Sequence, residues 1–489
     1  MAAKPRERAL GLTTPLGKDV LLLTGFTGRE SISSPFWLEL DLVAPNETAV
    51  PFEALLGSPM TIEVPAADAP GRFFHGICNR FSAGGRGPSV TTYRAEVVPQ
   101  FWLLTRKRQS RTFQQLSVPD ILRQALGGLD VEFELTAQYP ARNYCVQYRE
   151  SDFDFASRLM EEEGIFYFFR HAADGHTMVV GDSPASHPGL GTVAIDPGGR
   201  QPGSIVEWTK TQELRSGRVT LWDHSFELPS NHLEGQQGIQ PTALVGEVEH
   251  RLLLPANQGL ELYDYPGGYA KRFDGVGPGG GDQPDELAKI FPAAQRSAAL
   301  AAQVEAVASI EIEGSSLRRN LVTGSSMDVE RSDSRFNGKY LLTGVTHRAH
   351  VAGDPRTAGL KDLDYANSFT CIPDSVTFRP ARVTPKARVD GTQTAVVVGP
   401  PGEQIFTDRY ARVKVQFFWD REGAADNNSS CWIRVASPHA GSSPGFFVLP
   451  EVGDEVVVAF LEGDPDQPII VGSVWNAEKP PPPPRESGQ

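Results

Sequence analysis

The stretch TDRYARVKVQFFWDRE, residues 407–422, contains the pattern that indicates the fold class most directly. Arg412 and Lys414 alternate with valines, which predicts a β-strand with one solvated face and one buried face. Phe418 and Trp419 follow and place a large aromatic side chain on each face. A strand that becomes apolar on both sides is explained either by the wall of an active site or by an outer face that meets a second chain.

Glycine and proline are frequent along the whole sequence. The 48 glycines and 39 prolines among 489 residues exceed the average share of about 12% for the two together. They form no repeat, so they indicate many turns between short strands. We therefore expect a mainly β protein with a few helices, and the length predicts about three domains.

Charge and cysteine content exclude some classes of partner and site. The net charge of −14 repels phosphate backbones, so we do not expect a nucleic-acid partner. The basic run TRKRQSR (105–111) is typical of a solvated edge, with a binding patch as the alternative. The four cysteines form no CxxC pair, which argues against a zinc knuckle and fits reduced, buried thiols of a cytosolic product. No apolar run approaches the roughly 18 residues of a membrane helix.

Three helices are predicted between strands. Ser117 and Ser151 are good N-caps, and Gly164 is placed to end the second helix. The stretch 284–309 has the highest helix propensity in the chain, and Pro292 should kink or split it. The sequence before the first helix is read as strands. It contains two strand-like runs, RFFHGICNRF (72–81) and SVTTYRAEVVPQFWLL (89–104).

The sequence also predicts how the β-strands are organised. FFHGICNR (73–80) is echoed by LLTGVTHR (341–348), which suggests two similar β-modules. The Pro- and Arg-rich stretch 379–391 is a plausible boundary. The next 90 residues or so contain five or six short strands, GFFVLP among them, which suggests a small barrel. EGDPDQP (462–468) is read as a turn.

Three motifs in the sequence are candidates for a catalytic or metal site. Residues 441–445 fit G-x-S-x-G around Ser443, but Pro444 has no N–H to stabilise an oxyanion. His347 and His350 point to opposite faces of a strand, so they cannot share a metal. The run of glutamates at 161–163 points in different directions around a helix and should not converge on one substrate. We therefore expect no catalytic residue, cofactor or metal.

The sequence contains several long motifs of one kind: NYCVQYRESDFDFASRLMEEEGIFYFFRH (143–171), ELYDYPGGY (261–269), TAVVVGPPGEQIFTDRYARVKVQFFWDREG (394–423), SSCWIRV (429–435) and FLEGDPDQPIIVGSVWNA (460–477). Together they resemble the VgrG family, the spike proteins of the bacterial type VI secretion system, which are related to phage tail hub and spike proteins. The resemblance runs from about residue 10 to 478.

The resemblance implies a domain organisation. Residues 1–380, called the hub region below, would be a phage tail-hub-like region of two similar β-barrel modules with helical insertions. Residues 386–475, called the barrel, would be an oligonucleotide/oligosaccharide-binding-type β-barrel used for assembly. Residues 476–489 form a Pro-rich tail. The family usually continues into a needle, so we expect this tail to be its start and the natural chain to be longer, with a needle-less spike as the alternative.

The resemblance also implies a function. A homotrimer would adapt a hexameric inner tube to a membrane-puncturing tip, contact baseplate proteins and a PAAR-type tip protein, and carry effectors or adaptors. It would assemble in the bacterial cytoplasm, be secreted or injected on firing, and touch the target membrane only then. The alternative is a tail-associated, lysozyme-type cell-wall hydrolase of a phage-like particle. Whether the machine is a type VI system or another contractile injector stays open.

In such a trimer the two-faced aromatic strand has an explanation. Its outer face would pack on a neighbouring chain or on the hub region, with packing under a loop of its own barrel as the alternative. The candidate inter-subunit residues are Phe417, Phe418, Trp419 and Trp432.

Overall fold

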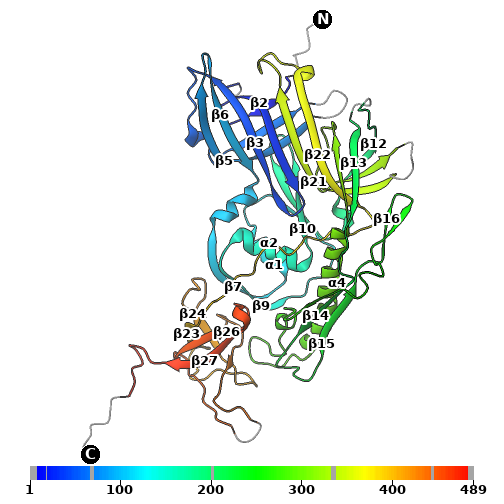
Figure 1. The fold of residues 1–489 in the computed structure, drawn as a ribbon. Coiled ribbons are helices and arrows are strands. Elements are labelled where there is room, and N and C mark those ends of the chain that lie inside the picture. Colours follow the sequence, from blue (N-terminus) through cyan, green and yellow to red (C-terminus); the bar gives the residue numbers. More distant parts are fainter. Residues whose placement is uncertain are drawn as a thin grey trace, which may run out of the picture.

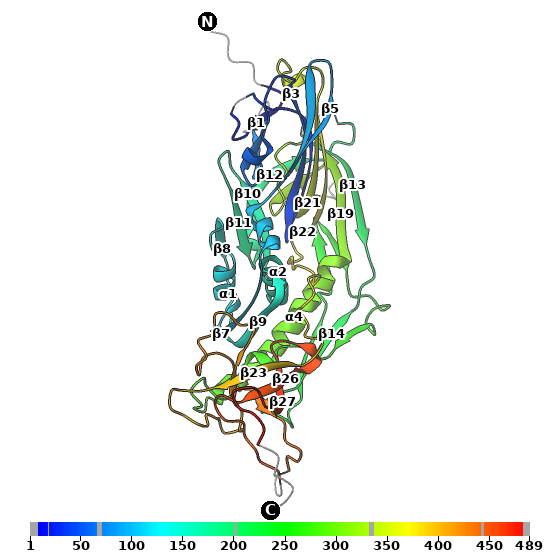
Figure 2. The ribbon, with the colours of Figure 1, turned by 90° about the vertical axis from the view of Figure 1, so that its left-hand side faces the viewer.

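The computed structural model describes residues 8–17, 19–65, 71–199, 203–331, 337–441 and 445–482. Strands predominate over helices in this part of the chain, which confirms the predicted fold class. The molecule is elongated, with the long strands of the largest sheet at one end, the longer helices in the middle and a small C-terminal sheet at the other end (Figures 1 and 2). None of the described helices is long and apolar enough to cross a membrane.

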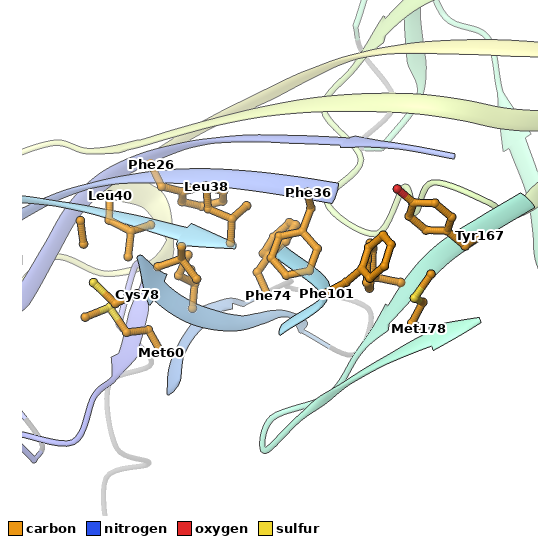
Figure 3. Packing of buried hydrophobic residues seen from close by; sticks show 14 of the residues in the cluster. Phe26, Phe36, Leu38, Leu40, Met60, Phe74, Cys78, Phe101, Tyr167 and Met178 are labelled. Carbon is orange, nitrogen blue, oxygen red and sulfur yellow. The ribbon is translucent and has the colours of Figure 1, made fainter. Parts of the chain in front are cut away.

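The first half of the largest sheet has the order β1-β4-β5-β6-β3-β2. Burial alternates along β3, so that Phe36, Leu38 and Leu40 are buried while Glu39 and its neighbour two residues on are exposed. The buried side chains form the largest core together with residues of β10 and β11 (Figure 3). The strands are β1 (Gly11–Thr13), β2 (Leu22–Ser31), β3 (Ser34–Pro45), β4 (Pro59–Val64), β5 (Arg72–Arg86) and β6 (Val90–Val98).

The second half continues the same sheet. β2 pairs antiparallel with β21, with Gly28 opposite His347, and the order runs on as β21-β22-β19-β13. This half has a core of its own. The two echoed stretches lie in β5 and β21, one in each half of the sheet, and the similarity of the two halves as modules stays a prediction. The strands are β12 (Gly189–Ala194), β13 (Ile205–Gln212), β19 (Ile310–Ser316), β20 (Ser326–Glu330), β21 (Gly338–Val351) and β22 (Leu363–Pro373).

The helices begin and end at the residues that the sequence indicates. The hydroxyl oxygens of Ser117 and Ser151 each accept the N–H three residues on, and Gly164 ends the second helix with φ 68°. The third helical stretch is split just before Ile290, and Pro292 lies in the first turn of the second piece. The helices are α1 (Val118–Ala125), α2 (Asp152–Glu163), α3 (Asp285–Ala288) and α4 (Ile290–Ser309).

Four small sheets connect the large sheet to the C-terminal part, and α4 packs on one of them. Their orders are β10 (Phe166–His171)-β11 (His176–Gly181)-β8 (Val131–Glu134), β7 (Arg108–Leu116)-β9 (Arg142–Ser151), β15 (Leu233–Gly238)-β14 (Arg218–Asp223)-β18 (Glu261–Asp264), and β16 (Thr242–Val245)-β17 (Val248–Arg251).

The barrel contains a five-stranded sheet that packs on an apolar core. β25 pairs parallel with β27, and the other three pairings are antiparallel. The order is β24 (Lys414–Phe417)-β23 (Gln393–Val398)-β26 (Glu455–Phe460)-β27 (Pro468–Val474)-β25 (Arg434–Val435).

Two strand predictions are wrong. The strand predicted over 89–104 ends at Val98, and the FWLL segment belongs to a 3₁₀ helix, Gln100–Arg106, because Pro99 supplies no N–H to continue the ladder. The GFFVLP segment forms no strand, and Phe447 is 73% exposed. No described strand lies beside it to satisfy its backbone groups, so apolar composition alone does not produce a strand.

Candidate functional site at the junction of the hub region and the barrel

The stretch from Arg412 to Phe417, which includes β24, is covered on both faces for most of its length. Val415 and Phe417 of β24 lie in the barrel core, as expected. Arg412 and Lys414 were predicted on a solvated face, but their exposed fractions are only 2% and 1%. The prediction is wrong because Asp274, in a hub loop of residues 273–277, binds Arg412. Lys414 instead donates to Asn427 within the barrel and lies against Trp432, whose indole binds the same hub loop. A buried polar face with partners far along the chain has the same alternating pattern as a solvated face.

Arg412 joins the two parts of the chain through a paired contact. Its Nη1 and Nη2 donate to the two carboxylate oxygens of Asp274 at 2.7 and 2.8 Å, while Nε donates to Asp408 at 2.6 Å. The guanidinium also lies over the ring of Phe226. Burial alone would lower the pKa of Arg412, but its hydrogen bonds to the carboxylate of Asp274, reinforced by Asp408, raise it above its usual value. The arginine is therefore charged, held by two planar contacts and shielded from water.

A second contact from the same loop fixes Trp432. The indole Nε1 of Trp432 donates to the carbonyl oxygen of Gly277 at 2.9 Å. The Nζ of Lys414 lies 4.9 Å from the centre of the Trp432 ring and donates to the carbonyl oxygen of Asn427. Burial lowers the pKa of Lys414, although nearby carboxylates act against this effect. The aromatic ring thus separates a buried lysine of the barrel from the hub loop.

Two aspartates of the segment read as a turn form a further buried cluster. Asp466 accepts the backbone N–H of Val146 in β9 at 2.7 Å and the Nζ of Lys386 at 2.5 Å. Lys271 of the hub region binds both Asp464 and Asp466. Burial would raise the pKa of Asp466, but Lys386 and Lys271 together hold it far below its usual range. The cluster joins the hub region and the barrel through full charges.

Strand β9 of the hub region completes the apolar core of the barrel. Tyr144 and Val146 are 3% and 0% exposed, and they belong to the same core cluster as Val415 and Ile470 of the barrel. A cavity of about 280 Å³ lies beside this contact, between β9, the hub loop and the barrel. The barrel therefore does not have a closed core without residues contributed by the hub region.

The glutamates at 161–163 hold the chain together. Glu161 accepts the N–H of Thr384, which lies between the hub region and the barrel, at 2.9 Å. Glu162 and Glu163 both bind Arg142, at 2.8 and 2.6 Å, so two of the three side chains do converge, contrary to the expectation. The forked guanidinium reaches two neighbouring carboxylates, which a helical-wheel argument overlooks. The partners of all three glutamates belong to this chain, which supports a structural role for the run over a catalytic one.

The four candidate packing residues fall into two groups. Phe417 and Trp432 are buried within this chain, with exposed fractions of 1% and 6%. Trp419 is half-buried, stacks on Phe417 and donates from Nε1 to Gln393 at 2.8 Å. Phe418 is 63% exposed. Only Phe418 and part of Trp419 offer surface to another chain, and their packing against a neighbour stays a prediction.

The remaining motifs give no site of chemistry in the described part of the chain. Ser443 lies outside the described residues. His347 is buried and His350 exposed, as expected for opposite faces of β21. The described residues contain no group of three potential ligands that could hold a metal ion. In the basic run, Lys107 and Arg111 both face the buried carboxylate of Asp152, which agrees with the structural interpretation.

The junction residues that sequence reasoning missed are acidic groups and lysines in loops. Asp274, Asp464 and Asp466 lie in Gly- or Pro-rich stretches that resemble ordinary turns. Their partners lie far away in the sequence; Lys271 and Asp466, for example, are separated by 195 positions. A single sequence contains no local signal for such pairs.

Comparisons with known proteins match nearly the whole chain. Residues 29–353 match the family model described as the phage tail baseplate hub (GPD), and residues 405–475 match the type VI secretion system/phage-baseplate injector OB domain. The type VI secretion system spike proteins VgrG1a and VgrG1b of Pseudomonas aeruginosa are 39% and 37% identical over 96% and 98% of this chain. The chain spans 70% and 62% of their lengths.

Solved structures with low sequence identity have the same fold. A structure of an E. coli component of the type VI secretion system, described as similar to the T4 bacteriophage tail proteins gp27 and gp5, has a TM-score of 0.60 at 21% identity and covers 95% of this chain and 99% of its own. The lidded Francisella PdpA-VgrG complex contains a chain with a TM-score of 0.60 at 9% identity, covering 97% of this chain and 72% of its own.

Proposed function

Because this chain belongs to the VgrG family of type VI secretion system spike proteins, we propose that it is a structural spike and hub component of a contractile injection machine. In this role it transmits force and carries out no reaction. The observation that carries the proposal is the buried attachment of the barrel to the hub region, through Arg412 and Asp274 and through the aspartates around Asp466.

A force-bearing spike requires that its parts do not separate under load. Buried ion pairs with complete hydrogen bonding are costly to open, because opening leaves a charge without a partner, at about 3–5 kcal/mol. β9 adds an apolar contact, since Tyr144 and Val146 would be exposed if the barrel moved away. The junction therefore favours movement of the hub region and the barrel as one body.

We propose that the functional particle is a homotrimer. Each chain contributes two β-modules, so three chains present six similar modules, which match the symmetry of a hexameric inner tube. Phe418 and the exposed part of Trp419 are the proposed contacts between barrels. The proposed division is 1–380 for the hub region, 386–475 for the barrel and 476–489 for a Pro-rich tail.

The proposed partners follow from this role. They are the inner-tube protein at the hub end, baseplate proteins around it, and a PAAR-type tip protein with effectors or adaptors beyond the barrel. Assembly would take place in the bacterial cytoplasm, followed by secretion or injection. A solved complex of PdpA with a Francisella VgrG is the reason for including additional protein partners.

The test is to mix the chain with preformed tubes of the cognate inner-tube protein and to image them by electron microscopy. We expect particles of threefold symmetry at one end of each tube. Tubes that stay uncapped at a molar excess of the chain would contradict the proposal. A peptidoglycan zymogram tests the alternative of a cell-wall hydrolase, for which we expect no cleared band.

A further inference from the structure

A second pocket lies away from the barrel, between the segment before β9 and the start of α4. It encloses about 440 Å³, and Arg142, Arg272 and Arg296 are among its lining residues. Tyr139 and Pro292 also line it, together with Pro140 and Ala293. The pocket therefore combines a cationic floor with largely apolar walls, and its size exceeds that of a single small anion.

The floor of this pocket has more positive than negative charge. Glu163 is the only carboxylate among its lining residues, and it binds all three arginines: Arg142 at 2.6 Å, Arg272 at 3.2 Å and Arg296 at closer range. Glu162 neutralises part of the Arg142 charge from outside the pocket at 2.8 Å. Two carboxylates thus face three guanidinium groups.

The arginines still have capacity for a further partner. Arg142 is 5% exposed, and its Nε has no hydrogen-bond partner among the described residues. Within the described part of the chain, Arg272 donates only to the carbonyl oxygen of Gly268 and to Glu163. Burial first, and then the charge of Arg142, lower the pKa of Arg272 to about 10. Like charges held together in a partly closed pocket favour binding of an additional anion.

The walls restrict what kind of anion fits. The guanidinium of Arg296 lies over the ring of Tyr139, 4.9 Å from its centroid, so this arginine is held against the wall of the pocket. Pro140, Pro292 and Ala293 add apolar surface around it. A planar carboxylate can accept paired N–H groups from a guanidinium, and an apolar body attached to it would cover the walls.

We propose that this pocket binds the C-terminal carboxylate of a protein chain whose last residue is apolar. The carboxylate would take the place next to Arg272 and Arg296, and the terminal side chain would lie against the proline walls. A free small carboxylic acid has the same charged group, but it would leave much of a cavity of about 440 Å³ empty. The inference does not depend on the trimer or on the proposed function.

The test is isothermal titration of the whole chain with acetyl-Ala-Ala-Leu. We expect saturable binding by the peptide with a free carboxylate, and binding at least about tenfold weaker by its C-terminal amide, because a charge-assisted hydrogen bond is lost. Acetate and isovalerate form the second arm. If either acid binds as tightly as the peptide, the proposal of a chain terminus is wrong. Absence of saturable binding by the peptide would overturn the site altogether.

A matched pair of variants places the binding in this pocket without disturbing the arginines. Pro292 and Phe291 are adjacent and exposed, but only Pro292 lines the pocket. Pro292→Glu adds a negative charge at the rim and should weaken peptide binding at least about tenfold, whereas Phe291→Glu should leave it unchanged. Pro292→Ala separates the effect of charge from that of the lost ring. Equal affinity for Pro292→Glu and the parent chain would contradict the assignment.

Discussion

Asp274 and Arg412 lie 138 positions apart in the chain, yet both oxygens of the Asp274 carboxylate are bound by the Arg412 guanidinium, at 2.7 and 2.8 Å. One residue comes from a Gly-rich loop of the hub region, and the other lies shortly before β24 of the barrel. Both are buried. The alternating pattern of the sequence predicts that Arg412 faces solvent. In the structure the carboxylate of Asp274 takes the place of that solvent.

The first prediction concerns the energy of this contact. Asp274→Asn keeps the shape of the side chain but leaves Arg412 with one carboxylate instead of two. We expect the free energy of unfolding to fall by about 3 kcal/mol, the order found when a buried ion pair loses a partner. The control is Asp282→Asn, which removes the 2.9 Å pair with Arg409 at the same junction, but at a carboxylate that is 61% exposed. That change should cost less than about 1 kcal/mol.

Urea denaturation of both variants measures the difference. Equal losses in the two variants would show that burial of the Asp274 pair contributes nothing beyond what an exposed pair contributes.

The second prediction concerns β9. Val146→Ala removes two methyl groups from the barrel core although the residue belongs to the hub region, and we expect a loss of about 2 kcal/mol. Hydrogen exchange should show reduced protection in β23 and β26, which lie in the barrel. Val383→Ala is the control, because Val383 is 77% exposed. Loss of protection confined to β7 and β9 would mean that the stability of the barrel core does not depend on β9.

The third prediction concerns acid. His176 is buried, its Nε2 accepts the N–H of Gln100 at 3.0 Å, and its Nδ1 lies 2.9 Å from Nδ1 of His75. Burial, and after it the charge of His171, lower the pKa of His176 to about 3. This folded value lies below the unfolded value of about 6.5. The unfolded state therefore binds more protons, and the stabilising contribution is complete above about pH 6.5 and is lost as the pH falls toward about 3.

The measurement is the free energy of unfolding at several pH values from about 7 to about 5, where the unfolded imidazole titrates. The parent chain should lose stability more steeply than His176→Gln, by up to about 1.4 kcal/mol per pH unit. His350→Gln, at an exposed position of β21, should follow the parent chain. A variant at His176 with the parent slope would contradict the sign or the site of the effect.

The sequence predicts those features that depend on neighbours along the chain. Ser117 and Ser151 cap their helices, and Gly164 ends one with a positive φ, because caps and stops are local properties. The barrel strands are indicated by short apolar runs between turn residues, which are also local signals. The two β-modules rest on the echo between 73–80 and 341–348 and stay a prediction. The buried state of Arg412 has no local signal, since its partner Asp274 lies in a hub loop more than a hundred positions away. The strand prediction for the exposed GFFVLP segment is wrong for the opposite reason, because no described strand lies beside it.

The fourth prediction concerns the contact between barrels. Phe418 is exposed and apolar, so Phe418→Asp should weaken a trimer by placing a charge in an apolar interface. Lys414 is unsuitable as a control because it is buried. Ala424→Asp makes the same change of charge at an exposed position of the following loop. Sedimentation over a dilution series should give dissociation at higher concentration for Phe418→Asp only. Identical behaviour of the two variants would remove Phe418 from the interface.

The most direct test of the account is the native mass of the unmodified chain. Its monomer mass is 53.2 kDa, and at about 10 µM, where mass action favours association, we expect a single species of three times that mass. A monomer as the only species across the concentration range would contradict a trimeric spike, however closely the fold matches that of the family.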